Sequence, residues 1–137
     1  MDVADETFLA VAPAVVAAQV SRPERWRAWW PDLRLTVHHD RGAEGLRWQV
    51  AGALRGSAEI WLEPVLDGTV LHYFLRGEDD GAVGAAAAGA LAHRRRLQGK
   101  AVALGLKREL EAGRAAGEPP PPTDTPDRRA PDAGPPA

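Results

Sequence analysis

The sequence predicts one small α+β domain over residues 1–116, built to enclose an apolar pocket, with a Pro-rich tail after it. Three observations predict this fold class. Segments of strand character separated by turn residues follow one another between residues 33 and 77, which is typical of an antiparallel meander. A long segment with apolar residues at helical spacing comes next. Hydrophobic residues make up 45% of the 137-residue chain, enough for the core of a single domain.

The N-terminal part is predicted to form one strand and two short helices. The strand covers Val3–Val11. Pro13 then stands where the first turn of a helix tolerates proline, and Ala14–Val20 contains strong helix formers. A second helix is predicted over Glu24–Trp30, because Pro31 ends it. Of the tryptophans in this helix we expect the first two to pack into the core and Trp30 to be exposed.

Four further strands are predicted, at Leu33–Asp40, Gly45–Ala51, Gly56–Glu63 and Thr69–Gly77. Successive side chains of a strand point to opposite faces, so alternation assigns the inner face. On the first of these strands the inner row is Leu33, Leu35, Val37 and His39, and on the second it is Leu46, Trp48 and Val50.

The last hairpin has a strong turn signal in Asp67-Gly68, which favours a two-residue type I′ turn with Leu66 opposite Thr69. This register places two apolar pairs on the inner face, Leu62 with Tyr73 and Ile60 with Leu75. It places three pairs on the outer face: Glu63 with His72, Trp61 with Phe74, and Glu59 with Arg76. One face is thus apolar, and the other joins two acid–base pairs to an aromatic pair.

A long helix is predicted from Ala82 or Ala85 to Gly113. The preceding Asp79 and Asp80 suit its N-terminus by capping and by the helix dipole. Residues at three- and four-residue spacing form one face: Leu91, Arg95, Gly99, Val102, Leu106 and Leu110. Glycines within the helix weaken it intrinsically, so tertiary packing must support it.

Composition restricts the setting and the partners. The net charge is −2, whereas a general nucleic-acid binder is normally clearly basic, so no nucleic-acid partner is expected. The chain has no cysteine, which excludes disulfides and thiolate metal sites and favours a cytoplasmic location. We find no stretch of 18 apolar residues and no signal-peptide pattern, so no membrane span is expected.

The last 20 residues differ in composition from the rest of the chain. Residues 118–137 contain eight of the twelve prolines and almost no apolar side chain larger than alanine. Such a segment cannot bury enough apolar surface to offset the entropy of ordering. We therefore expect residues 117–137 to be a disordered Pro-rich tail with polyproline II character.

The order of these elements resembles the START-like (SRPBCC) superfamily, in its polyketide cyclase/dehydrase branch. The segment APAVVAAQVSRPERWRAWWPDL carries the resemblance, through Ala12-Pro13 and the Trp-rich sequence that ends at Pro31. The segments SAEIWLEPVLDGTVLHYFLR and LKRELEAGR resemble the last hairpin and helix of that superfamily. The resemblance covers about residues 2–114. It implies a helix-grip fold, in which a curved antiparallel sheet of about five strands wraps around the long C-terminal helix.

In the superfamily a hydrophobic cavity lies between sheet and helix, and usually six strands follow the helix pair. Four are predicted here, so one hairpin is missing. We expect any pocket to lie between the inner face of the sheet and the long helix. Its predicted lining is Trp48, Leu46, Ile60, Tyr73, Leu75, Arg95, Val102 and Leu106.

Three polar residues could carry chemistry in such a pocket. Tyr73 is the one tyrosine; its phenol could donate a hydrogen bond to a carbonyl or act as a weak acid, or be an ordinary core side chain. Arg95 could anchor a carboxylate or an enolate, or extend to the surface with its neighbours. His39 is a weak candidate for a base. The histidine spacing predicts no metal site, and we expect no cofactor.

Three functions are compatible with these observations. The first is a binding protein for a small apolar or amphipathic molecule, polyketide-like or lipid-like. The second is an enzyme of the polyketide cyclase, aromatase or dehydrase type, in which a pocket folds the substrate and polar groups stabilise enolates. The third is an interaction module without a cavity. The sequence identifies neither the ligand nor the oligomeric state.

Overall fold

The computed structural model describes residues 1–78 and 84–111, apart from the side chain of Ala85. The predicted Pro-rich tail over 117–137 and the predicted capping pair Asp79 and Asp80 lie outside these residues. The elements in chain order are β1 (Asp2–Leu9), α1 (Pro13–Val20), α2 (Pro23–Trp29), β2 (Leu33–Asp40), a short 3₁₀ turn (Gly42–Glu44), β3 (Gly45–Gly52), β4 (Arg55–Val65), β5 (Gly68–Glu78) and α3 (Ala85–Glu111).

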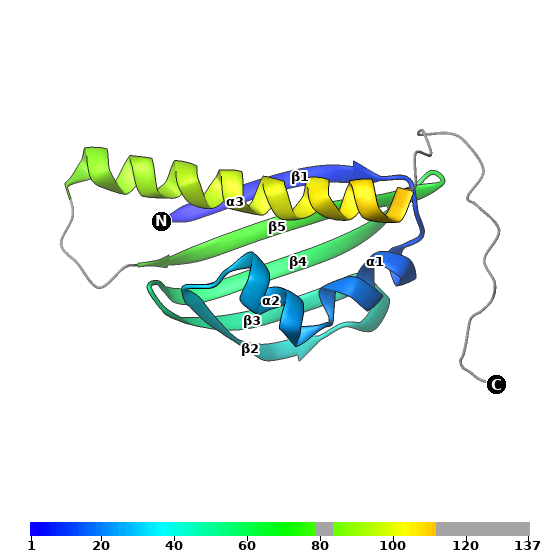
Figure 1. Cartoon of the computed structure of the whole chain (residues 1–137), viewed down its shortest axis with the longest axis horizontal. Coiled ribbons are helices and arrows are strands. Elements are labelled where there is room, and N and C mark those ends of the chain that lie inside the picture. The colour runs from blue at the N-terminus through cyan, green and yellow to red at the C-terminus, as the bar shows by residue number, and fades with distance from the viewer. Residues whose placement is uncertain (79–83, 112–137) are drawn as a thin grey trace.

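The strands form one antiparallel sheet in the order β1-β5-β4-β3-β2 (Figure 1). All three helices lie on the same face of this curved sheet, with α3 along β1 and β5, and α1 and α2 beside the other strands. The predicted α+β helix-grip arrangement with five strands is therefore confirmed. None of the helices within the described ranges is both long and apolar enough to cross a membrane.

Proline sets the bounds of the two short helices. Pro13 and Pro23 each occupy the first turn, where the missing N–H has no intrahelical partner to lose. At the end of α2, Trp30 leaves the helical conformation with φ −131° and ψ 73°. The following Pro31 favours such an extended conformation in the residue before it. The chain then turns at once into β2, with Leu33 N–H donating to the carbonyl oxygen of Trp30 at 3.1 Å.

The predicted register of the last hairpin is wrong by two residues. Val65 pairs with Gly68, so the turn residues are Leu66 and Asp67, and Leu66 has a positive φ of 54°. Gly68 is required inside β5 because a Cβ there would overlap the Leu9 carbonyl oxygen and lie 2.7 Å from Phe8 Cζ. The glycine that suggested a turn position thus serves a close approach between β5 and β1.

The faces of this hairpin are nevertheless as predicted, because a shift of two residues preserves the alternation. Leu62 pairs with Leu71 and Ile60 with Tyr73, in place of the predicted partners, and these side chains are all buried. On the outer face His72 still bonds Glu63 diagonally, with 2.9 Å between Nε2 and Oε1. The predicted pair of Glu59 with Arg76 and the directly opposite pair of Trp61 with Phe74 do not form.

The inner row predicted for β2 ends early. Leu33 is buried and Leu35 partly so, but the side chain of Val37 is 43% exposed. The pairing with β3 shifts between Val37 and His39, because β2 has one extra residue there, His38, that is not paired in the register with β3. His39 is exposed, so the prediction that it faces the pocket is wrong. A bulge near the end of this edge strand takes the row away from the core.

The predicted core stripe of α3 is confirmed. Arg95, Gly99, Val102 and Leu106 are buried, and Leu91 and Leu110 at the two ends of the stripe are partly buried. Leu104, on the other side of the helix, is 39% exposed. Lys100 and Lys107 attach the helix to β1: Lys100 Nζ donates to Thr7 Oγ1 at 2.8 Å, and Lys107 Nζ donates to the Phe8 carbonyl oxygen at 2.9 Å. The stripe faces the sheet, and basic side chains bind along its margin.

We expect Leu106→Ala to lower the free energy of unfolding by about 2–5 kcal/mol, because it leaves a cavity in the core. Leu104→Ala removes the same atoms from a partly exposed position of the same helix and is expected to cost less. Urea unfolding of both variants measures the difference. Equal losses, or a greater loss for Leu104→Ala, would contradict the assignment of the core stripe.

Candidate functional site

Four aromatic side chains form a cluster on the inner face of the sheet. Trp26 comes from α2, Trp30 from its C-terminal end, Trp48 from β3 and Tyr73 from β5. The ring of Trp30 stacks on Tyr73 at 6.1 Å with an interplanar angle of 10°. The ring of Trp48 contacts Trp26 edge-to-face at 5.3 Å and lies 6.0 Å from Trp30. Such offset and edge-to-face contacts are the favourable geometries for aromatic pairs.

Three polar atoms of this cluster are buried without a partner among the described residues. They are Nε1 of Trp30, Nε1 of Trp48 and the hydroxyl of Tyr73. These three residues are only 1%, 0% and 2% exposed. Buried polar groups are almost always hydrogen-bonded, and one left unpaired costs about 1–3 kcal/mol. Three in one cluster therefore indicate a position where something else supplies acceptor atoms.

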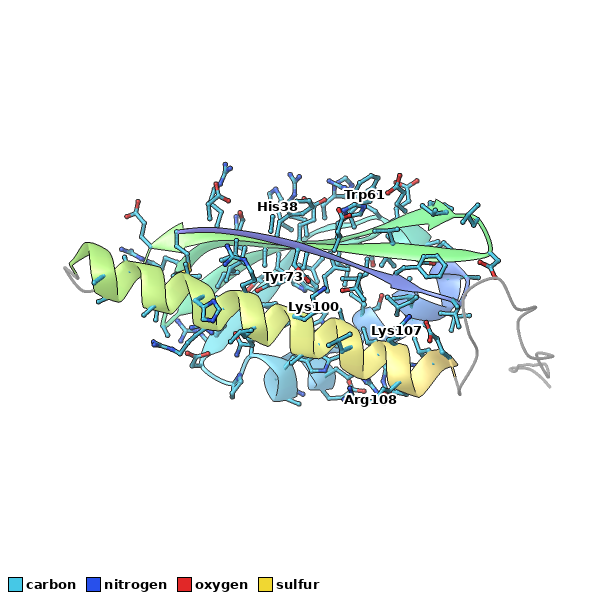
Figure 2. The ribbon with its side chains drawn as sticks, turned by 90° about the horizontal axis from the view of Figure 1, so that it is seen from above. His38, Trp61, Tyr73, Lys100, Lys107 and Arg108 are labelled. Carbon is cyan, nitrogen blue, oxygen red and sulfur yellow. The ribbon has the colours of Figure 1, made fainter. Side chains whose placement is uncertain are left out.

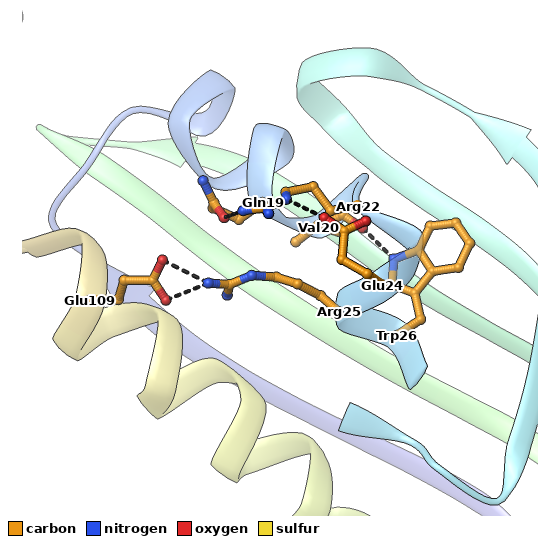
Figure 3. A network of polar contacts seen from close by, with 7 residues as sticks. All are labelled: Gln19, Val20, Arg22, Glu24, Arg25, Trp26 and Glu109. Carbon is orange, nitrogen blue, oxygen red and sulfur yellow. Dashed lines mark hydrogen bonds and ion pairs between the residues drawn. The ribbon is translucent and has the colours of Figure 1, made fainter. Parts of the chain in front are cut away.

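Trp26 provides the contrast within the same cluster. Its Nε1 donates to the Val20 carbonyl oxygen at 2.6 Å (Figure 3). The neighbouring Arg25 donates to both carboxylate oxygens of Glu109 on α3, at 2.7 and 2.8 Å. This part of α2 is thus fully bonded, so the unpaired donors belong to the deeper side of the cluster.

The Tyr73 hydroxyl is held in its protonated form. Burial raises its pKa to about 12; the Trp30 indole N–H, which lies near the hydroxyl oxygen without meeting hydrogen-bond geometry, and the Arg95 charge lower the pKa by less. At neutral pH the group is therefore a hydrogen-bond donor and not a base. Figure 2 shows Tyr73 between the sheet and α3.

Arg95 is bonded at the edge of this cluster. Its Nη1 and Nη2 donate to Oδ1 and Oδ2 of Asp32 at 3.1 and 2.8 Å, and Nη1 also donates to Oε1 of Gln98 at 2.9 Å. The side chain of Arg95 is 10% exposed, whereas that of Asp32 is 51% exposed. The hydrogen bond from Arg95 lowers the pKa of Asp32, so the carboxylate is ionised at neutral pH.

A hollow of about 490 Å³ opens beside this ion pair. Its lining joins apolar and charged side chains: Asp32, Leu91, Arg94, Arg95, Leu97 and Gln98. Arg95 thus lines the hollow, and Gly99, one turn later on the same helix face, lies against the Tyr73 ring. A volume of this size accommodates a small molecule.

The predicted pocket residues come together, but as packed core. One continuous cluster of buried side chains contains Leu46, Trp48, Ile60, Tyr73, Leu75, Val102 and Leu106. Arg95 borders it, and its predicted orientation toward the inside is observed. His39 is not part of it. Sequence reasoning missed Trp30, a member of this cluster that was expected to be exposed but is 1% exposed. It also did not consider Asp32, the half-exposed partner of Arg95 outside the cluster.

A second hollow, of about 560 Å³, lies on the opposite, uncovered face of the sheet, where Figure 2 places His38 and Trp61. Its charged groups already pair with one another or with neighbours. Glu59 accepts from Arg41 at 2.8 Å and from Arg47 at 3.2 Å, and Asp2 accepts from Arg76 at 3.2 Å. The acidic side chains of this hollow are thus paired, and Trp48 is the one residue of the aromatic cluster among its lining residues.

The comparisons with known proteins identify the fold. No family model and no curated protein matches the chain. Solved structures do, each at low identity. The chain is similar to DR_A0006 from Deinococcus radiodurans (TM-score 0.61, 13% identity, covering 82% of this chain and 99% of that one). It is similar to the Aha1 dimer from Colwellia psychrerythraea (TM-score 0.59, 14% identity, covering 84% of this chain and 99% of that one). It is also similar to a START superfamily protein from Mycobacterium smegmatis (TM-score 0.56, 15% identity, covering 80% of this chain and 98% of that one).

These similarities place the chain in the helix-grip class of α+β proteins. More narrowly, the fold is START-like, as the resemblance found in the sequence implied.

The unpaired hydroxyl leads to a prediction about stability. Tyr73→Phe removes only an atom without a partner, so we expect the free energy of unfolding to stay unchanged or to rise by up to about 1 kcal/mol. Thermal and urea unfolding measure it. As the comparison, Trp26→Phe removes a bonded N–H and strands the Val20 carbonyl, and we expect it to lose about 2 kcal/mol or more. A loss above about 1 kcal/mol for Tyr73→Phe would mean that its hydroxyl has a partner within the protein.

Proposed function

We propose that this protein binds a small apolar or amphipathic molecule between the inner face of the sheet and α3. The observation that carries the proposal is the set of three buried, unpaired donors on Trp30, Trp48 and Tyr73. Small-molecule sites are typically apolar with a few convergent polar groups, and this cluster has that composition. The START-like fold, whose helix and sheet face each other across the core, provides the setting.

The donors define what the ligand presents. Two indole N–H groups and one phenol hydroxyl can all donate, and the indoles cannot accept. A carbonyl, carboxylate or ether oxygen would satisfy them. The donors come from the end of α2, from β3 and from β5, and the Trp30 ring contacts those of both Trp48 and Tyr73. An ordered water is the simplest occupant of the position, and a ligand oxygen would replace it.

Binding accounts for the site better than the two other functions do. An interaction module without a cavity gives no reason for unpaired donors in its core. An enzyme could use the same donors to stabilise an enolate, but it would also need a base, and Tyr73 with a pKa of about 12 stays protonated near neutral pH. His39, the base suggested by the sequence, is exposed on the edge strand.

The proposal predicts preference for a hydrogen-bond acceptor. N-phenyl-1-naphthylamine, an apolar dye that fluoresces on burial, is expected to bind and to take up energy from the buried tryptophans. Benzophenone should displace the dye at about five- to tenfold lower concentration than diphenylmethane, which has the same rings without the carbonyl; that ratio corresponds to one hydrogen bond. In Tyr73→Phe the ratio should fall toward one.

Trp26→Phe is the matched control, because the indole it removes is already bonded and the ratio should persist. Trp48→Phe should lower the energy transfer to the dye. Native mass spectrometry of the protein purified from its own host gives an independent measurement, with a co-purifying small molecule as the expected result. The proposal would be overturned if the dye does not bind and no small molecule co-purifies with the protein.

A further inference from the structure

We infer that the ligand carries a carboxylate that binds Arg95. Before the ligand enters, the carboxylate of Asp32 holds this position, and the ligand's carboxylate displaces it. This inference rests on the proposed function, because it assumes that a ligand enters between the sheet and α3. It adds the chemical class of the ligand and a mechanism of entry. The argument starts from the unequal surroundings of the two charges.

Arg95 is fixed, and Asp32 is free to leave. The guanidinium is 10% exposed and is held additionally by Gln98, on the same helix face. A buried cation without an anionic partner is strongly unfavourable. The carboxylate of Asp32 is 51% exposed, so water can solvate it with little change in its surroundings. The guanidinium therefore requires a carboxylate, but nothing requires that it be the one of Asp32.

Exchange keeps the charges balanced. Before entry Arg95 holds the Asp32 carboxylate in a two-bond arrangement, and afterwards it would hold the ligand's carboxylate in the same geometry, which suits a planar guanidinium. Asp32 would turn into solvent with its charge intact. Gln98 Oε1 would keep its bond to Nη1 throughout. No unpaired charge arises inside the protein at either end of the step.

The hollow beside the ion pair suits the entry of such a molecule. Leu91 and Leu97 line it together with Arg94 and Arg95, and Leu97 is 55% exposed. An apolar body would contact the leucines, and the two arginines would attract the anionic end. Gly99, one turn after Arg95 on the same helix face, lies against the Tyr73 ring, so the carboxylate position is one helical turn from Tyr73.

Displacement of the Asp32 side chain would also remove a side-chain link between α3 and the turn that carries Trp30. Only Pro31 separates the two residues, and two backbone bonds keep the turn closed: Leu33 N–H donates to the Trp30 carbonyl oxygen, and Ala53 N–H donates to the Asp32 carbonyl oxygen, both at 3.1 Å. The Trp30 ring stacks on the ring of Tyr73. A shift of this turn would therefore open space beside Tyr73 for the rest of the ligand, which fits the dense packing of the inner face while Asp32 is bound.

The test compares 4-benzoylbenzoate with benzophenone, which differ by one carboxylate, in displacement of N-phenyl-1-naphthylamine. Wild-type protein should prefer the carboxylate. Asp32→Asn removes the internal competitor and should raise the affinity for 4-benzoylbenzoate about tenfold, with little change for benzophenone. Arg95→Gln should abolish the preference. An unchanged preference in both variants would overturn the inference, while displacement by benzophenone would still support the proposed function.

Asp2→Asn is the matched control, since Asp2 pairs with Arg76 beside the hollow on the other face. Asp2→Asn should leave the affinities for 4-benzoylbenzoate and benzophenone unchanged. If the affinity for 4-benzoylbenzoate rises in Asp2→Asn and not in Asp32→Asn, the carboxylate binds on the other face of the sheet and the inference is wrong. Wild-type protein gives a measurement that does not depend on how the variants fold. The carboxyl ¹³C resonance of Asp32 and the indole resonance of Trp30 should both shift with 4-benzoylbenzoate at pH 7. An Asp32 resonance that stays unmoved at saturation would contradict the exchange.

Discussion

The close approach of α3 to β5 is the constraint on which the rest of the structure depends. Gly99 lies directly over Tyr73, and a Cβ at that position would overlap two carbons of the ring. Because the helix has no side chain there, it can cover the tyrosine almost completely. The same approach positions Arg95 one turn earlier, at the edge of the aromatic cluster. A glycine that weakens the helix intrinsically therefore creates the buried environment of the site.

Patterns with a fixed period predicted most of the fold. Apolar residues at helical spacing identified the face of α3, and alternation identified the inner faces of β3, β4 and β5. Those assignments tolerate an error of two residues in register, because side chains repeat with period two. The register itself was not predictable, since Gly68 has two possible reasons to be glycine. Turn chemistry was visible in the sequence, whereas the approach of Phe8 and Leu9 from β1 was not.

The site was only partly predictable, and for a related reason. Tyr73, Trp48 and Arg95 lie within long periodic elements, where a face can be assigned by counting. Trp30 and Asp32 lie in a turn between two elements, where no period applies. The partner of Asp32 is 63 positions away in the sequence, so its role depends on tertiary packing alone. The prediction that His39 faces the pocket was wrong because a bulge on the edge strand interrupts the alternation of side chains. The local sequence does not indicate this bulge.

The distribution of hydrogen bonds around the aromatic cluster separates support from recognition. Where α2 meets α1 and α3, each polar group discussed above has a partner, as with the Trp26 indole and the Arg25–Glu109 pair. Deeper, three donors have none, although each could be replaced by an apolar ring of similar shape without leaving a partner stranded. A chain selected for stability alone would gain from such replacements. Sites that sacrifice stability in this way are expected where a polar group serves a ligand. Here they coincide with Arg95, the one buried arginine of the described residues, whose carboxylate partner is half exposed.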